Sequence, residues 1–175
     1  IIILYTFLGG FSAVCWTDFF QGLLMLAALL IAPIFALTML KGSGAVVGSE
    51  LPENYWSFTG DWRTIVSGLG WGLGYFGMPH IIIRFMSVRS QKELRKSSVI
   101  GISWTLIILT MSVAAGAVGR VMSSRGIIEI TDSATVFIQM TRAIFPALIS
   151  GILLSAILAA SMSTADSQLL ASASA

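Results

Sequence analysis

FFQGLLMLAALLIAPIFALTML, residues 19–40, runs for 22 positions without a charged side chain. A helix that crosses a bilayer needs about 20 mainly apolar residues, so this stretch predicts a membrane span. The rest of the chain has the same character, because 56% of its 175 residues are hydrophobic and 10% are charged. A soluble domain has roughly 25% charged residues. We therefore predict an all-α membrane protein.

Further apolar stretches extend this prediction to about four transmembrane helices and one partial helix. The predicted spans are 1–12 (partial), 19–40, 64–86, 99–121 and 146–175. The chain starts without Met and ends within an apolar run. We therefore expect residues 1–175 to form a single transmembrane domain that is incomplete at both ends.

Two polar segments separate the spans. Residues 42–63 are rich in Gly and contain Pro, Glu and Asp, which predicts a water-exposed loop. In the second segment, apolar residues recur at helical spacing and predict an amphipathic helix on the surface of the protein or the membrane. These residues are Val136, Phe137, Met140 and Ile144.

The basic residues are concentrated in one short connection, residues 84–98. It contains one acid, Glu93, and five basic residues: Arg84, Arg89, Lys92, Arg95 and Lys96. Short connections rich in Lys and Arg remain on the cytoplasmic side of a membrane. The span before this connection is therefore predicted to run inward, the span after it outward, and the last span inward.

GWGLGYFGMPH, residues 70–80, has the G-x-G-x-x-G spacing of a dinucleotide-binding loop. That loop requires a preceding β-strand and an acid about 20 residues later. Here the glycines lie within a predicted membrane span, and Lys96, Ser97 and Ser98 lie about 20 residues after the last of them. One remaining interpretation is close packing of helices through small residues. The other, which we favour, is a broken helix whose freed backbone groups line a transport path. Five glycines between Gly68 and Gly77, followed by Pro79, indicate more breakage than packing requires.

Trp71, Tyr75 and Pro79 recur every four residues beside these glycines. On a helix they would form one stripe. Such a stripe is typical of packing or of an interfacial aromatic belt, and it also suits an apolar wall of a solute site with Tyr75 as its polar group. His80 is the only histidine, and we interpret it as a packing or helix-end residue.

LAASMSTADSQLL, residues 158–170, places several oxygen-bearing side chains in an otherwise apolar span. Ser and Thr in membrane helices often bond to their own backbone carbonyls, which explains one or two of them. The carboxylate of Asp166 needs another partner. Hard cations prefer oxygen ligands, so we expect the hydroxyls of Ser163 and Thr164 and the carbonyl of Ala160 to supply part of a sodium site. The other ligands would have to come from another helix.

Three motifs resemble the sodium/solute symporter family, most closely its proline-transporting members. They are GGFSAVCWTD (9–18), WGLGYFGMPHIIIRFM (71–86) and SGILLSAILAASMSTADSQLL (150–170). The resemblance implies a fragment of a leucine-transporter-type inverted-repeat fold, from the end of its fourth core helix to most of its eighth.

The same resemblance implies roles for individual residues. Trp71, Tyr75 and Pro79 would bind or gate the solute. Sodium would be held by the carbonyl of Ala160 and the hydroxyls of Ser163 and Thr164. Asp18 matches an acid near the ion path, although a helix N-cap before residues 19–40 explains it equally well.

Two positions depart from the pattern of the family. Met78 stands where some proline symporters have Gln. Asp166 stands where others have a neutral residue, which makes it a second candidate for the ion path.

We therefore expect sodium-coupled import of a small solute, L-proline, by alternating access in the cell membrane. The expected partners are the solute, Na⁺ as coupling ion and the lipid bilayer, with no cofactor and no nucleic acid. No pair of nucleophile and base suggests an enzyme. Two alternatives remain: a symporter for pantothenate, a sugar or a carboxylate, and the symporter-like sensor domain of a histidine kinase.

Overall fold

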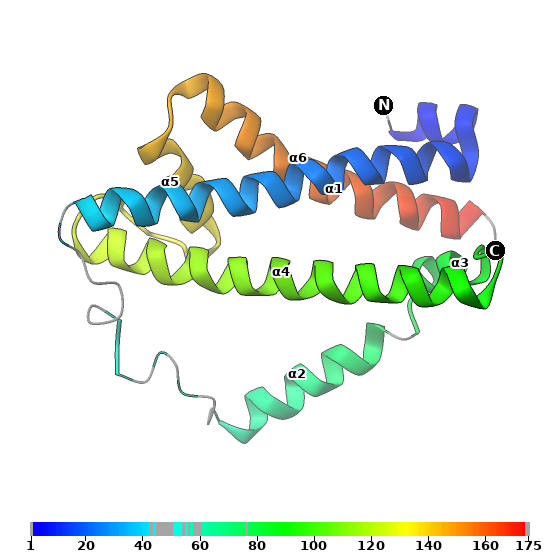
Figure 1. The fold of residues 1–175 in the computed structure, drawn as a ribbon, viewed down its shortest axis with the longest axis horizontal. Coiled ribbons are helices and arrows are strands. Elements are labelled where there is room, and N and C mark those ends of the chain that lie inside the picture. Colours follow the sequence, from blue (N-terminus) through cyan, green and yellow to red (C-terminus); the bar gives the residue numbers. More distant parts are fainter. Residues whose placement is uncertain are drawn as a thin grey trace.

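The computed structural model describes residues 2–42, 44, 51–53, 55, 57, 61–75 and 77–173. All regular elements in these ranges are helical (Figure 1). The elements are α1 (Ile2–Gly42), α2 (Trp62–Tyr75), α3 (Pro79–Met86), α4 (Gln91–Ser124), the short 3₁₀ helix η1 (Ser133–Thr135), α5 (Val136–Ile144) and α6 (Ala147–Ala173). Most of the predicted 42–63 loop lies outside the described residues.

Within the described ranges, three helices are long and apolar enough to cross a membrane: Tyr5–Gly42, Gln91–Ser124 and Ala147–Ala173. They confirm an all-α chain with several membrane spans. The sequence predicted one further span over residues 64–86, but the structure divides this stretch into the two shorter helices α2 and α3. Neither half has the length of a membrane-crossing helix.

The first helix is continuous where the sequence suggested a connection. Residues 16–18 are helical, and the break lies earlier, at Gly10, where φ is 55° and ψ is −151°. Glycine reaches this backbone region without the clash that a Cβ would cause. The hydroxyl of Thr17 donates to the carbonyls of Ala13 and Val14, so this polar residue is accommodated within the helix. Asp18 is therefore not an N-cap, and that interpretation was wrong.

Helix α1 packs against both α4 and α6, and the three helices form the main bundle (Figure 1). Tyr5, near the start of α1, bonds to Asp166, near the end of α6. Further along α1, Ala28 packs with Leu153 and Ala156 of α6, so α1 and α6 are antiparallel. The late turns of α1 and α4 pack together around Leu40 and Val118. The opposite directions of α4 and α6 agree with those predicted from the basic residues.

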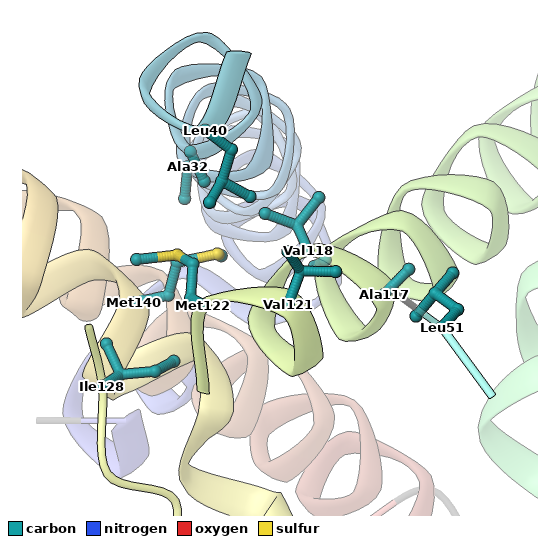
Figure 2. Packing of buried hydrophobic residues seen from close by; sticks show 11 residues of the cluster. Ala32, Leu40, Leu51, Ala117, Val118, Val121, Met122, Ile128 and Met140 are labelled. Carbon is teal, nitrogen blue, oxygen red and sulfur yellow. The ribbon is translucent and has the colours of Figure 1, made fainter. Parts of the chain in front are cut away.

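The closest packing of α1 follows small side chains spaced by four residues. Ala28, Ala32, Ala36 and Leu40 are all buried. Small residues at this spacing let membrane helices approach closely, and dispersion contacts then hold them. Figure 2 shows Leu40 of α1 beside residues of α4 and α5, with Met122 and Met140 filling the space between helices.

The predicted amphipathic helix is confirmed as α5. Its Met140 is fully buried in the main core cluster, and Phe137 packs against that cluster. Because α5 presents these residues to α1 and α4, it lies on the protein and covers one end of the bundle. The polar cluster described next lies toward the other end, where α1, α3 and α6 meet.

Candidate ion and solute site

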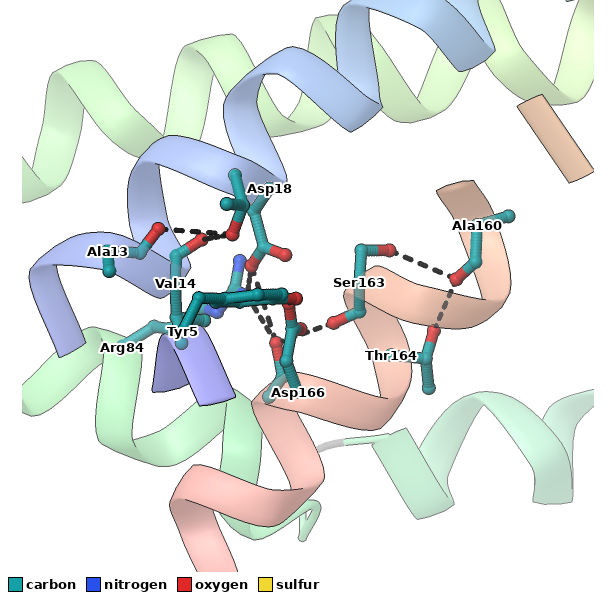
Figure 3. Close-up of polar contacts among 11 residues, drawn as sticks. Tyr5, Ala13, Val14, Asp18, Arg84, Ala160, Ser163, Thr164 and Asp166 are labelled. Atoms are coloured by element: carbon teal, nitrogen blue, oxygen red, sulfur yellow. Dashed lines mark hydrogen bonds and ion pairs between the residues drawn. The ribbon is translucent and has the colours of Figure 1, made fainter. Parts of the chain in front are cut away.

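A cluster of three polar side chains joins α1, α3 and α6 (Figure 3). Arg84 of α3 forms an ion pair with Asp18 of α1. The same guanidinium nitrogen of Arg84 donates to Oγ of Ser167 on α6, at 2.6 Å. We call Asp18, Arg84 and Ser167 the Arg84 cluster.

The break in the glycine-rich segment positions Arg84. Helix α2 ends at Tyr75, and Met78 has an extended backbone with φ −72° and ψ 118°. Pro79 then starts α3, a position that suits proline because its fixed φ is helical and its missing N–H is not needed there. Arg84 lies in the last turn of α3, where a positive charge is favoured by the helix dipole. The predicted broken helix is thus confirmed as a structural feature.

The three predicted sodium ligands lie within one turn of α6. The hydroxyls of Ser163 and Thr164 donate to the carbonyl of Ala160 at 3.0 and 3.1 Å, as Figure 3 shows. These hydroxyls therefore point at the same carbonyl oxygen, and the three oxygens form a compact group. Backbone bonding of this kind extends further along α6 than the sequence suggested, since Ser161 and Ser167 also donate to carbonyls four residues earlier.

A cavity of about 350 Å³ brings Asp18 together with Ser163 and Thr164. Besides these three, it is lined by Gly22, Met25, His80, Ile81, Arg84, Trp104 and Ser167. Sequence reasoning missed Arg84 as a site residue, because it assigned Arg84 to the basic connection. The signal was present in the sequence: a charged residue within the apolar stretch HIIIRFM needs an internal partner.

Asp166 faces a different neighbour. It is fully buried, and its Oδ2 accepts a hydrogen bond of 2.5 Å from Oη of Tyr5. Its Oδ1 is buried and has no hydrogen-bond partner among the described residues. Asp166 is not part of the wall of the 350 Å³ cavity. The structure thus separates the two acids predicted for an ion path: Asp18 lies at the cavity and Asp166 lies against the first turns of α1.

The predicted solute residues lie at and before the break. Trp71 and Tyr75 are 70% and 48% exposed, and their ring centroids are 5.7 Å apart. Helix α2 has no buried residue and projects away from the bundle (Figure 1). The structure therefore does not bring Trp71 and Tyr75 to Ser163 and Thr164. Pro79 lies closer to Ser163 and Thr164, because its neighbour His80 lines the same cavity as these two residues.

Close helix packing does not explain the glycines of α2 in the described structure. An added Cβ at Gly68, Gly70, Gly72 or Gly74 would meet no atom within 4 Å. At these positions, no described helix approaches closely enough to require a small residue.

Comparison with known proteins identifies the family. The whole chain, residues 1–175, matches the Sodium:solute symporter family. The chain belongs to this family. The sodium/proline symporter of Staphylococcus aureus strain USA300 / TCH1516 is 48% identical over 177 residues, which cover 99% of this chain and 35% of that protein. The sodium/proline symporter of strain JH9 is 47% identical, with the same coverage.

The chain thus spans about a third of the length of the curated relatives that it matches, 35%. No solved structure matches it significantly. Membership of the sodium:solute symporter family confirms the resemblance carried by the three motifs. Together with the three membrane-crossing helices, it identifies the chain as part of a multi-pass membrane protein.

Proposed function

We propose that the protein imports L-proline together with Na⁺ across the plasma membrane by alternating access. The observation that carries this proposal is the 48% identity to a sodium/proline symporter over 99% of the chain. The arrangement of oxygen atoms on α6 is independent support. We also propose that residues 1–175 are part of a single transport domain with the leucine-transporter-type inverted repeat. The division of the glycine-rich segment into α2 and α3 and an oxygen-lined helix antiparallel to α1 suit that fold.

Sodium would be held by Ala160, Ser163 and Thr164. At present the hydrogens of both hydroxyls point to the carbonyl of Ala160. A cation between the three oxygens requires these hydrogens to turn away, so that every oxygen presents a lone pair. The two hydrogen bonds that are lost contribute about 0.5–1.5 kcal/mol each. Their loss must be offset by the ion and by further ligands from another helix.

Asp18 and Asp166 are proposed to lie along the ion path. Asp18 suits this role because it lines the cavity that also contains Ser163 and Thr164. Asp166 lies on the same helix as the ligands, and its buried Oδ1 has no hydrogen-bond partner among the described residues. A carboxylate in a membrane-spanning segment favours cations over anions.

Trp71, Tyr75 and Pro79 are proposed to line the solute path at the break. The two aromatic rings lie next to each other, at 5.7 Å, and present an apolar surface that suits the proline ring. The backbone groups freed between α2 and α3 suit the polar ends of an amino acid.

Sodium coupling provides the energy for import. One positive charge that moves inward across about 100 mV releases about 2.3 kcal/mol. This corresponds to a roughly fifty-fold accumulation of solute, before any sodium gradient is added. Sodium bound first would stabilise the conformation that binds proline, and by linkage proline would increase the affinity for sodium to the same degree.

The test uses the full-length protein in proteoliposomes with labelled proline. We expect uptake to require sodium and to be lost when choline replaces it. The double variant Ser163→Ala, Thr164→Ala should raise the sodium concentration for half-maximal uptake at least about tenfold, since two ion-facing oxygens are removed. Ser161→Ala is the matched control, because the Ser161 hydroxyl donates to Ile157 and Ser161 does not line the cavity.

Four outcomes would contradict parts of this proposal. Uptake in choline equal to that in sodium would refute sodium coupling. A double variant with the wild-type sodium dependence would refute the site. Sodium-dependent uptake of pantothenate, a sugar or a carboxylate in place of proline would retain the symporter and change the solute. Sodium-dependent phosphorylation without uptake would instead identify a kinase sensor.

A further inference from the structure

Arg84 connects α6, which carries the proposed sodium ligands, to α3, which begins at the proposed solute residue Pro79. It lies on α3, directly after the break, and its guanidinium contacts both Asp18 of α1 and Ser167 of α6. We propose that Arg84 is a positioning residue that couples sodium binding on α6 to the position of α3, and so to the solute site. This inference rests on the proposed function and adds to it the residue through which the two sites communicate.

The connection from Arg84 to the ion ligands is short. Arg84 donates to Oγ of Ser167 at 2.6 Å, and Ser167 donates to the carbonyl of Ser163 at 2.8 Å. The side chain of Ser163 is one of the proposed sodium ligands. Two hydrogen bonds therefore link the guanidinium to the turn of α6 that binds the ion. Hydrogen-bond networks carry coupling between two sites when the element that they hold has two discrete arrangements.

Helix α3 has few other anchors. It is eight residues long, and none of its residues is buried. Helix α2 ends at Tyr75 and α3 begins only at Pro79, so α3 is free of the restraint that a continuous helix would impose. Besides the packing of α3 on α6, the ion pair with Asp18 and the bond to Ser167 attach α3 to the bundle. A residue with this placement can hold α3 in one position or release it.

The two charged groups of the ion pair that attaches α3 to α1 differ in their exposure. The side chain of Asp18 is 11% exposed, whereas that of Arg84 is 50% exposed. A carboxylate this well covered within a membrane protein needs a counterion, and Arg84 supplies it. Both groups line the cavity that contains Ser163 and Thr164. Removal of the guanidinium thus has two effects: it detaches α3 and leaves the negative charge of Asp18 facing the ion site.

These two effects predict an unusual pattern for Arg84→Gln in the full-length protein. Sodium affinity without proline should stay the same or increase up to about threefold, because the carboxylate is no longer neutralised. The factor by which sodium increases proline affinity should fall about tenfold, within the usual range of coupling between sites. Arg84→Lys restores the charge and should recover at least half of the coupling on a logarithmic scale.

The measurement is equilibrium binding in detergent. Sodium binding is followed by tryptophan fluorescence, for which Trp104 in the cavity wall is a suitable reporter, and proline binding by scintillation proximity with and without sodium. Arg89→Gln is the matched control, because it removes an exposed positive charge from the same connection. Ser167→Ala tests the second hydrogen bond without a change in charge and should lower the coupling about threefold. It decides the question if Arg84→Gln does not fold.

The outcomes separate this inference from the proposed function. If sodium does not increase proline affinity in the wild type, the proposed function fails. If the wild type is coupled and both Arg84→Gln and Ser167→Ala keep the full coupling factor, only the role of Arg84 is overturned. Equal losses in Arg84→Gln and Arg89→Gln would also overturn it, since bulk charge would then explain the effect. A parallel loss of sodium affinity and coupling would indicate a purely structural role and would overturn it as well.

Discussion

The hydrogen bond between Tyr5 and Asp166 provides a direct test of the α1–α6 contact. Tyr5 Oη lies 2.5 Å from Oδ2 of Asp166, and the other carboxylate oxygen, Oδ1, has no hydrogen-bond partner in the described structure. Tyr5→Phe removes this single partner and leaves the fully buried carboxyl group with none. It also keeps the ring, so the packing around it is preserved.

The expected loss of stability follows from that geometry. A hydrogen bond to a charged group contributes about 1.5–3 kcal/mol. A buried charge that loses its partner costs about 3–5 kcal/mol in the most enclosed cases. Since Tyr5 is only partly buried, the site is not among the most enclosed cases, and we expect about 2 kcal/mol. This value corresponds to a roughly thirty-fold change in the folding equilibrium.

The assay is reversible unfolding of the full-length protein in mixed micelles, followed by tryptophan fluorescence. Tyr75→Phe is the control for stability, since it removes the same hydroxyl from a side chain that is 48% exposed. The double variant Tyr5→Phe, Asp166→Leu completes the cycle, because removal of both polar partners leaves no unsatisfied group. We expect it to be at least about 1 kcal/mol more stable than the two single changes together predict. Equal effects of Tyr5→Phe and Tyr75→Phe, or strict additivity in the cycle, would refute the reasoning.

Three glycines give further predictions for the same unfolding assay. Gly119→Ala would place a Cβ 2.3 Å from Cγ1 of Val136. This contact forces α4 and α5 apart and should destabilise the protein by about 1–3 kcal/mol. The control is Gly101→Ala on the same helix, whose Cβ meets nothing within 4 Å and which should be neutral or stabilising by up to about 1 kcal/mol. Gly10→Ala puts a side chain at φ 55° and ψ −151°, which should cost about 1–3 kcal/mol. Unchanged midpoints for Gly119→Ala and Gly10→Ala would contradict the close contact and the backbone break.

The amino-acid sequence is sufficient to predict the membrane class, most of the helices and the family. Long apolar stretches such as residues 19–40 can be stable only where their side chains meet lipid or other helices. The glycines and Pro79 are likewise local signals, because the backbone itself is weakened where they occur. Local signals of this kind also placed Ala160, Ser163 and Thr164 within one helical turn, where the structure has them.

Contacts between segments that are distant in the sequence could not be predicted from such local signals. Polar residues at 16–18 suggested a connection, yet the chain continues as a helix and breaks at Gly10, because Asp18 finds its counterion in Arg84, 66 residues later. The partner of Asp166 likewise lies 161 residues away, at Tyr5. A buried charge needs a partner, and this requirement can be read from a single segment. Which residue satisfies it depends on how α1, α3 and α6 pack, so the Arg84 cluster emerges only when these helices are brought together.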